Sequence, residues 1–294
     1  MIGGSRLRRS HEVASASEPH TARVPNPLRC VYCDLDGTLV GRGGSLFHDG
    51  EGGVSLLGAR AAEACLRAGV ELVLVSGRRR ETVQQPARML GQRSFAYESG
   101  AVVVLDGEEH WLTGDYVPRD GRTAWELIES SGAPALLLER FAGRLEYHDP
   151  WHRGRAVSHL FRGRVDAWEA ERLLAEHGHA GLRLVDNGAV DPAEMPAVEQ
   201  PRAYLLVPRT VSKAGAVAFH RRARGYAREE CIAVGDSRED LGMAGQVGTF
   251  WLVANALERD PSVRDALTPG VRVADGRHGA GVYEAVMTEL AERR

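Results

Sequence analysis

The chain has 294 residues, of which 43% are hydrophobic and 26% charged, close to the average of globular proteins and unlike a mostly disordered chain. Its 37 basic and 40 acidic residues give a net charge of −3, which speaks against binding to the phosphate backbone of nucleic acids. No apolar run approaches the ~20 residues needed to cross a bilayer, and four cysteines do not make a disulfide framework, so we expect a cytoplasmic protein of two domains without membrane contact.

The first half of the chain alternates between strand and helix patterns. Residues 1–27 are polar, have no apolar segment of a secretory signal and are predicted to be a disordered tail. An apolar strand is predicted at 29–33, a helix at 55–68 that stops before a glycine, a strand at 70–75 and a helix at about 79–90. This order predicts a doubly wound parallel sheet.

The pattern changes in the middle of the chain and then returns. Short apolar segments separated by Gly, Asp and Pro, with helices near 122–130 and 166–177, predict a small α+β unit. A strand at 204–207, a helix at 212–224 and a strand at 230–234 restore the earlier rhythm. We therefore predict an α/β, Rossmann-like core at 28–104 and 204–294, interrupted by an inserted α+β domain at 105–203.

Polar side chains follow the predicted strands at the points where ligands bind to such sheets. Two carboxylates follow the first strand, a Ser-Gly pair follows the second, another carboxylate follows the strand at 230–234, and a lysine begins the helix at 212–224. In chain order these residues are Asp34, Asp36, Ser76, Gly77, Lys213 and Asp236.

The carboxylates are spaced so that they can share a cation. Asp34 and Asp36 are two residues apart, so in an extended chain both point to one side. Asp236 and Asp240 are four apart and would share one face of a helix. Clustered acids repel one another, and a divalent cation that prefers oxygen ligands relieves this repulsion, which suits Mg²⁺.

The remaining groups fit phosphate chemistry. Lys213 is the only lysine, so 36 of the 37 basic residues are arginine, and its survival indicates a position that needs a compact ammonium group. The Ser76 hydroxyl and the Gly77 amide can bind phosphoryl oxygens. One carboxylate can serve as the nucleophile, and a second can exchange protons with the leaving group and with water.

Four segments in this order resemble the motifs of the haloacid dehalogenase superfamily phosphohydrolases: Asp34-Leu-Asp-Gly-Thr38, Val75-Ser-Gly-Arg78, Ser212-Lys213 and Gly235-Asp-Ser-Arg-Glu-Asp240. The resemblance implies that Asp34 is the nucleophile and a Mg²⁺ ligand, and that Asp36 is the general acid and base and offers its backbone carbonyl to the metal. It also implies that Ser76 and Gly77 hold the phosphoryl group, Lys213 neutralises it, Asp236 binds the metal and Asp240 supports the metal site.

The position of the insert, between Ser76 and Lys213, resembles the C2-type cap of the Cof-like and sugar-phosphatase branches. The segment Glu98-Ser-Gly-Ala101 resembles their Asn-Gly-Ala entry to the cap, with Ser99 in place of the usual Asn. The resemblance implies a Mg²⁺-dependent phosphatase that acts through an aspartyl-phosphate on a small phosphorylated metabolite, a sugar or polyol phosphate.

Two other functions stay open: a phosphomutase of the same superfamily and a non-catalytic phosphoester-binding protein. A P-loop nucleotide-binding protein is excluded because no G-x-x-x-x-G-K is present, and a dinucleotide dehydrogenase is disfavoured because no G-x-G-x-x-G follows the first strand. The pattern does not indicate an oligomeric state.

Several basic residues to which the motifs assign no role also bear on the site. One arginine of Arg78–Arg80 is expected to face its entrance. The insert carries a group of histidines and arginines without a recognisable set of metal ligands, which we predict to be solvated loop residues, the alternative being that some face the substrate. These residues are His148, His152, Arg153, Arg155 and His159.

Overall fold

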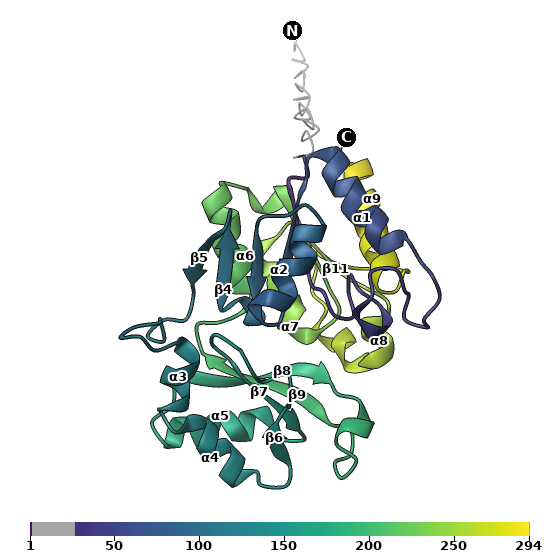
Figure 1. The fold of residues 1–294 in the computed structure, drawn as a ribbon. Coiled ribbons are helices and arrows are strands. Elements are labelled where there is room, and N and C mark those ends of the chain that lie inside the picture. The colour runs from purple at the N-terminus through teal and green to yellow at the C-terminus, as the bar shows by residue number, and fades with distance from the viewer. Residues whose placement is uncertain (2–26, 294) are drawn as a thin grey trace.

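The computed structural model describes Met1 and residues 27–293, so the predicted disordered tail lies outside the described residues except for its two ends. The described chain forms a larger α/β unit and a smaller α+β unit, each built on its own sheet (Figure 1). The predicted fold class, a Rossmann-like core with an inserted cap, is confirmed.

The larger unit, called the core, contains an eight-stranded sheet in the order β12-β11-β10-β1-β2-β3-β4-β5. The first six of these strands are parallel, whereas β4 pairs antiparallel with both β3 and β5. Strands β1 and β10 are buried along their whole length, as expected for parallel strands covered on both faces. The strands are β1 (Cys30–Cys33), β2 (Glu71–Val75), β3 (Phe95–Tyr97), β4 (Val102–Leu105), β5 (Glu108–Trp111), β10 (Cys231–Gly235), β11 (Thr249–Leu252) and β12 (Val271–Val273).

Helices cover both faces of the large sheet. Helices α1, α2 and α9 pack on one face and α6 on the other, and α1 lies beside α9 (Figure 1). Helix α1 ends at Gly69, whose φ of 67° is the left-handed conformation that glycine adopts without strain. The helices are α1 (Leu57–Ala68), α2 (Arg80–Met89), α6 (Lys213–Arg224), α7 (Arg238–Leu241), α8 (Asn255–Arg259) and α9 (Gly279–Glu292), and the predicted helices at 55–68, 79–90 and 212–224 are confirmed.

The smaller unit, called the cap, contains an antiparallel sheet in the order β6-β7-β9-β8 with three helices. The helices predicted near 122–130 and 166–177 are present as α3 and α5. The elements are β6 (Leu145–Tyr147), β7 (His159–Gly163), β8 (Leu182–Ala189), β9 (Arg202–Pro208), α3 (Ala124–Glu129), α4 (Ala133–Arg140) and α5 (Ala167–Glu176).

Two strands lie in the other unit from the one that we predicted. The strand predicted at 204–207 as part of the core is β9, which lies between β7 and β8 in the cap sheet. An almost wholly buried apolar strand resembles a parallel core strand in sequence, and its periodicity alone does not identify its sheet. Conversely, β5 falls within the predicted insert at 105–203 but closes the edge of the large sheet. We propose that the insert extends from residue 112 to 212, between β5 and α6.

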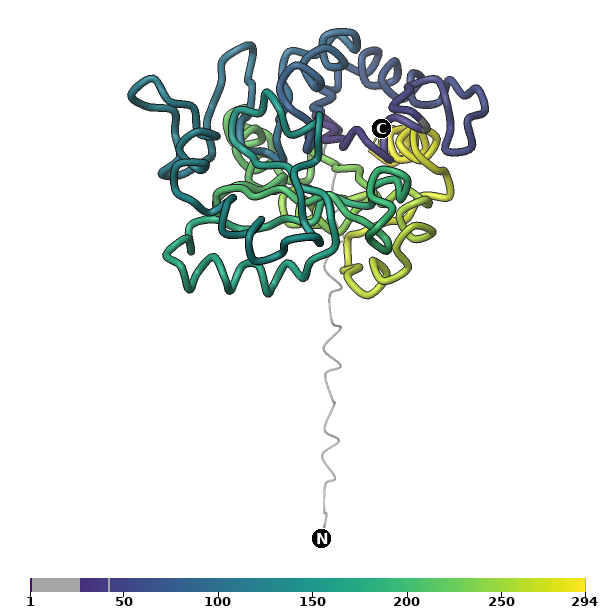
Figure 2. Tube along the Cα trace, turned by 60° about the horizontal axis from the view of Figure 1, so that its bottom comes forward, coloured from purple at the N-terminus to yellow at the C-terminus, as the bar shows by residue number. Residues whose placement is uncertain are grey.

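The cap lies on one side of the core, next to the edge of the sheet at which α7 and α8 lie (Figure 1). Figure 2, turned so that this side comes forward, shows the teal and green cap in front of the core. None of the described helices is long and apolar enough to cross a membrane.

Candidate active site

Three neighbouring parallel strands bring the predicted site residues to one edge of the large sheet. Asp34 follows β1, Ser76 follows β2 and Asp236 follows β10, and these strands are adjacent in the order β10-β1-β2. Gly37 has a φ of 82°, and a Cβ at this position would collide with the Asp236 carboxylate. The glycine of the first motif is therefore required both by its backbone conformation and by the close approach of Asp236.

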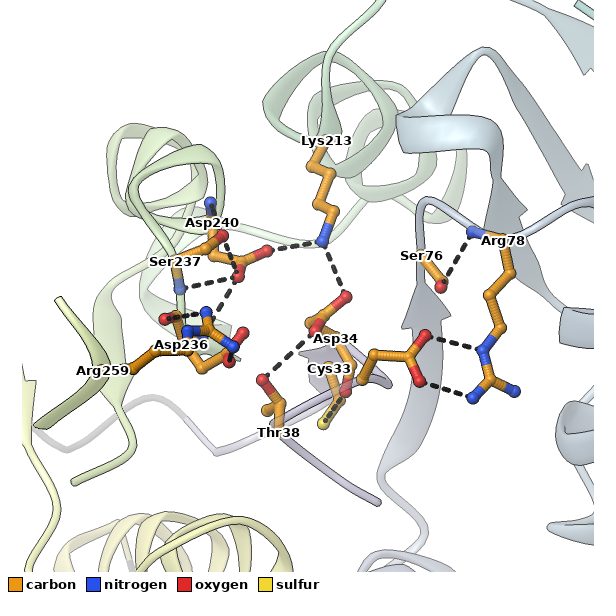
Figure 3. Close-up of polar contacts among 11 residues, drawn as sticks. Cys33, Asp34, Thr38, Ser76, Arg78, Lys213, Asp236, Ser237, Asp240 and Arg259 are labelled. Atoms are coloured by element: carbon orange, nitrogen blue, oxygen red, sulfur yellow. Dashed lines mark hydrogen bonds and ion pairs between the residues drawn. The ribbon is translucent and has the colours of Figure 1, made fainter. Parts of the chain in front are cut away.

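Lys213, the lysine of the third motif, contacts acids of the first and fourth motifs. Its Nζ donates to Asp34 Oδ1 and to Asp240 Oδ1, both at 2.7 Å, and Lys213 is only 4% exposed (Figure 3). The Ser212 side chain accepts a hydrogen bond from Gly215 N at 3.0 Å and so caps α6, which places Lys213 in the first turn. The structure thus brings Asp34, Lys213 and Asp240 together, as the motif order predicts.

Asp240 has two structural tasks besides its contact with Lys213. Its Oδ2 accepts hydrogen bonds from the Asp236 and Ser237 amides, both at 3.1 Å, and from Ser237 Oγ at 2.6 Å. The Ser237 hydroxyl in turn caps α7 by accepting from Asp240 N. Because both of its oxygens are engaged, Asp240 holds Lys213 and the start of α7 in fixed positions.

The acids form a group that fits a metal ion. Carboxylate oxygens of Asp34, Asp236 and Asp240 lie within 4.8 Å of one another, and all three residues are buried. Burial raises the pKa of Asp34 well above its usual range, although Lys213 opposes the shift. Burial also raises the pKa of Asp236 to about 6, against the charge of Arg259, whose Nη1 lies 2.9 Å from Asp236 Oδ2. A crowded set of buried carboxylate oxygens fits Mg²⁺, which prefers oxygen ligands.

Asp36 lies apart from this buried group. Its side chain is 57% exposed, and Arg78 donates to both of its carboxylate oxygens, with Nε at 2.7 Å from Oδ2. Ser76 Oγ accepts a hydrogen bond from Arg78 N at 3.2 Å, so one turn holds both the predicted phosphate-binding residues and the partner of Asp36 (Figure 3). Arg78 is thus the arginine of Arg78–Arg80 that lines the site.

A cavity of about 240 Å³ opens over these residues. All of the predicted catalytic, phosphate-binding and metal-binding residues line it. Arg78 and Arg155, which were considered as residues near the site, also line it, and so do three residues that were not predicted: Asn187, Glu239 and Arg259. Glu239 follows directly from its place in the motif. Asn187 carries no local sequence signal, because only the fold brings β8 to the core.

Two of the insert's histidines, His148 and His159, are not solvated as we predicted. His159 is fully buried and stacks on Trp125 with 4.4 Å between ring centroids, and buried His148 contacts the Glu194 carboxylate at 2.9 Å. Burial lowers the pKa of His159 to about 4, which favours the neutral ring in the cap interior. The pattern of the insert did not reveal these packing roles. Arg155, by contrast, lines the catalytic cavity.

No family model matches the chain, but individual proteins do. The chain is 27% identical over 261 residues to a phosphoglycolate phosphatase of Archaeoglobus fulgidus, which covers 88% of this chain and 95% of that protein. A phosphoglycolate phosphatase of Methanoculleus marisnigri is 25% identical over 262 residues, with the same shares covered.

Solved structures share the fold at low sequence identity. A sucrose-phosphatase from Synechocystis, solved with sucrose and phosphate, has a TM-score of 0.63 at 14% identity and covers 90% of this chain and 98% of its own. A phosphatase of the haloacid dehalogenase superfamily from Bacteroides thetaiotaomicron has a TM-score of 0.61 at 15% identity and covers 94% and 99%.

In its fold the chain is similar to haloacid dehalogenase-like phosphatases with an inserted cap, and its ordered motifs agree with that similarity. Both of the curated relatives, at 27% and 25% identity, are named phosphatases. The resemblance stated from the four motifs is confirmed.

Proposed function

We propose that the protein is a Mg²⁺-dependent phosphatase that hydrolyses a small phosphate monoester through an aspartyl-phosphate on Asp34. The observation that carries this proposal is the contact of Lys213 with Asp34 and Asp240, 2.7 Å to each, beside buried Asp236. The proposed nucleophile Asp34, the Lys213 ammonium group and the carboxylates proposed to bind the metal therefore line the same cavity.

The metal would be held by Asp34 and Asp236, with Asp240 supporting them and the backbone carbonyl of Asp36 as a further ligand. When bound, Mg²⁺ neutralises charge on the phosphoryl oxygens and on the acids. Lys213 holds Asp34 Oδ1 in place and supplies a second positive charge, and Ser76 and the Gly77 amide hold the phosphoryl group.

In the first step a carboxylate oxygen of Asp34 attacks phosphorus, and the bond between phosphorus and the leaving-group oxygen breaks. Asp36 gives a proton to that oxygen, so the alcohol leaves neutral. Water then attacks phosphorus and gives its proton to Asp36, and the bond from phosphorus to Asp34 breaks to release phosphate. Because Asp36 is paired with Arg78, its side chain must turn away from Arg78 to act in this way.

The cavity volume of about 240 Å³ supports a small leaving group. Our sequence-based prediction is a sugar or polyol phosphate, whereas the two curated relatives are named for phosphoglycolate. A substrate panel that includes both kinds of ester separates them.

The test is phosphate release by the purified protein with Mg²⁺ and after chelation. We expect turnover of small phosphate esters only with the metal, and a loss of at least about 10³-fold in kcat for Asp34→Asn. Asp115→Asn, which changes an exposed carboxylate in the same way, is the matched control and should behave as wild type. Undiminished turnover by Asp34→Asn overturns the nucleophile, isomerised product without phosphate indicates a mutase, and tight binding without turnover indicates a binding protein.

A further inference from the structure

Among the described residues, one cation that lines the cavity has no acidic ion-pair partner. Four cationic side chains line the cavity, and three of them pair with a carboxylate: Arg78 with Asp36, Lys213 with Asp34, and Arg259 with Asp236. The fourth is Arg155 of the cap, and no carboxylate within residues 27–293 lies within 4.0 Å of its guanidinium nitrogens.

Arg155 is held in place by neutral acceptors alone. Its Nη1 donates to the backbone carbonyl of Gly77 at 3.1 Å and to Ser158 Oγ at 2.8 Å, and its Nε donates to the carbonyl of Trp151 at 3.2 Å. The side chain is partly buried, and burial lowers the pKa of its guanidinium. A desolvated cation without a direct ion-pair partner favours an anion that can reach it.

The charge of Glu98 acts on Arg155, but the Glu98 carboxylate oxygens accept hydrogen bonds from other donors. Buried Glu98 accepts hydrogen bonds from the amides of Ala156, Val157 and Ser158 at 2.7, 3.1 and 2.6 Å, and from Ser158 Oγ at 2.7 Å. These bonds fasten the cap loop that carries Arg155 to the core. Glu98 therefore fixes where Arg155 sits without donating or accepting a bond to its guanidinium.

Arg155 and Asn187 both reach the turn that is proposed to bind phosphate. Asn187 lies at an irregularity in β8, between Asp186 and Gly188, and such a bulge redirects a side chain. A Cβ on Gly77 would lie 2.6 Å from Asn187 Oδ1, so the cap side chain sits directly on this glycine. Both cap residues therefore border the cavity beside the Ser76-Gly77 turn that is proposed to bind phosphate.

We infer that Arg155, with Asn187 beside it, is a subsite for a carboxylate on the leaving group, so that the preferred substrates are small phosphate monoesters of hydroxy acids. This inference rests on the proposed phosphatase function and narrows its substrate class. The phosphoryl group itself has Lys213, Ser76 and the Gly77 amide in the core, whereas Arg155 comes from the cap. Its position makes the guanidinium a specificity-determining group that contacts the part of the substrate beyond the ester oxygen.

The test compares two esters that differ in the carboxylate. Initial rates are measured for 2-phosphoglycolate and for 2-hydroxyethyl phosphate, a neutral polyol ester of similar length, with p-nitrophenyl phosphate as a general phosphatase substrate. We expect the wild type to prefer 2-phosphoglycolate in kcat/KM, and Arg155→Gln to lower this preference about 100-fold, mainly through KM. Arg155→Lys should restore part of the preference, since it returns the charge without the planar fork.

The matched control is Arg153→Gln, which removes an exposed arginine of the same loop that pairs with Asp149, and it should keep the wild-type preference. An equal loss for the acidic and the neutral ester in Arg155→Gln would overturn the subsite and assign Arg155 to the phosphoryl group. Turnover of p-nitrophenyl phosphate without a preference for the acid in the wild type also overturns the subsite but leaves the phosphatase intact. No turnover of any ester with Mg²⁺ instead overturns the proposed function.

Discussion

The Glu98 carboxylate links the core to the cap through hydrogen bonds, and Glu98→Gln tests how much these bonds contribute to the free energy of unfolding. Glu98 is fully buried in the turn between β3 and β4, and it accepts four hydrogen bonds from residues 156–158, which directly precede β7. The substitution keeps the size of the side chain but replaces one acceptor oxygen by an NH₂ group.

The expected cost follows from how the four bonds are divided. Oε2 accepts three of them and Oε1 accepts the bond from Ala156 N at 2.7 Å. If the glutamine oxygen takes the Oε2 position, the glutamine NH₂ group faces the Ala156 amide, so that two donors face each other. Leaving these buried donors without an acceptor costs about 1–3 kcal/mol. The three bonds to the glutamine oxygen also weaken, because they change from charge-assisted to neutral hydrogen bonds. We expect the free energy of unfolding to fall by about 3 kcal/mol, allowing for the lower cost of burying an amide than a carboxylate.

The assay is urea unfolding followed by tryptophan fluorescence and circular dichroism. Glu108→Gln, at an exposed position of β5 in the core, is the control and should change stability by less than about 0.5 kcal/mol. If Glu98→Gln also changes it by less than that, the carboxylate does not fasten the cap, and the reasoning from its hydrogen bonds is wrong.

Three further predictions concern single residues. Lys213→Arg should lower kcat at least about 100-fold in phosphate-release assays, because a planar guanidinium does not reproduce the two 2.7 Å hydrogen bonds that the single buried Nζ atom donates. Near wild-type turnover would contradict the role of the ammonium group. Gly37→Ala should raise the Mg²⁺ concentration that gives half-maximal activity, because its Cβ displaces the Asp236 carboxylate at a φ of 82°, and an unchanged Mg²⁺ titration would oppose this. Burial alone would raise the pKa of Glu71, but the nearby His220 ring, whose Nε2 lies 3.4 Å from Glu71 Oε1, and the hydrogen bonds from Arg224 outweigh burial and lower the pKa from 4.5 to about 2. This carboxylate therefore contributes about 3 kcal/mol to the free energy of unfolding above pH 4.5, and the contribution is lost as the pH falls toward 2. In unfolding experiments at different pH values, the difference in the free energy of unfolding between wild type and Glu71→Gln should therefore shrink over that range.

The sequence predicts the convergence of Asp34, Ser76 and Asp236 because it depends on a rule of topology. Parallel strands of an open sheet present their carboxyl ends at one edge, so recognising three apolar strands also places the residues that follow them. Lys213 is predicted by its scarcity and its place at the start of a helix, although the strand before that helix belongs to the other sheet. The prediction of the site therefore survives an error in the strand assignment.

The sequence does not reveal contacts between segments that no local pattern links. Arg259 pairs with Asp236 across 23 residues, and Asn187 reaches Gly77 only because β8 lies against the core. The apolar run at 202–208 has the same pattern whether it lies in a parallel core or at the centre of a covered antiparallel sheet. Likewise, His159 is buried by stacking on Trp125, a contact set by the packing of the cap.

The central claim is that Asp34 carries the phosphoryl group during the reaction, and trapping that adduct tests it most directly. The Asp36→Asn variant is mixed with p-nitrophenyl phosphate and Mg²⁺, quenched in acid within one turnover and digested for mass spectrometry. The p-nitrophenolate leaving group needs no proton, so the adduct still forms in this variant. Its hydrolysis is slow, because the variant lacks the general base that activates water. We predict phosphate attached to the peptide at Asp34, and none in the double variant with Asp34→Asn. Release of phosphate at an undiminished rate with no adduct on Asp34 at any time would contradict the account.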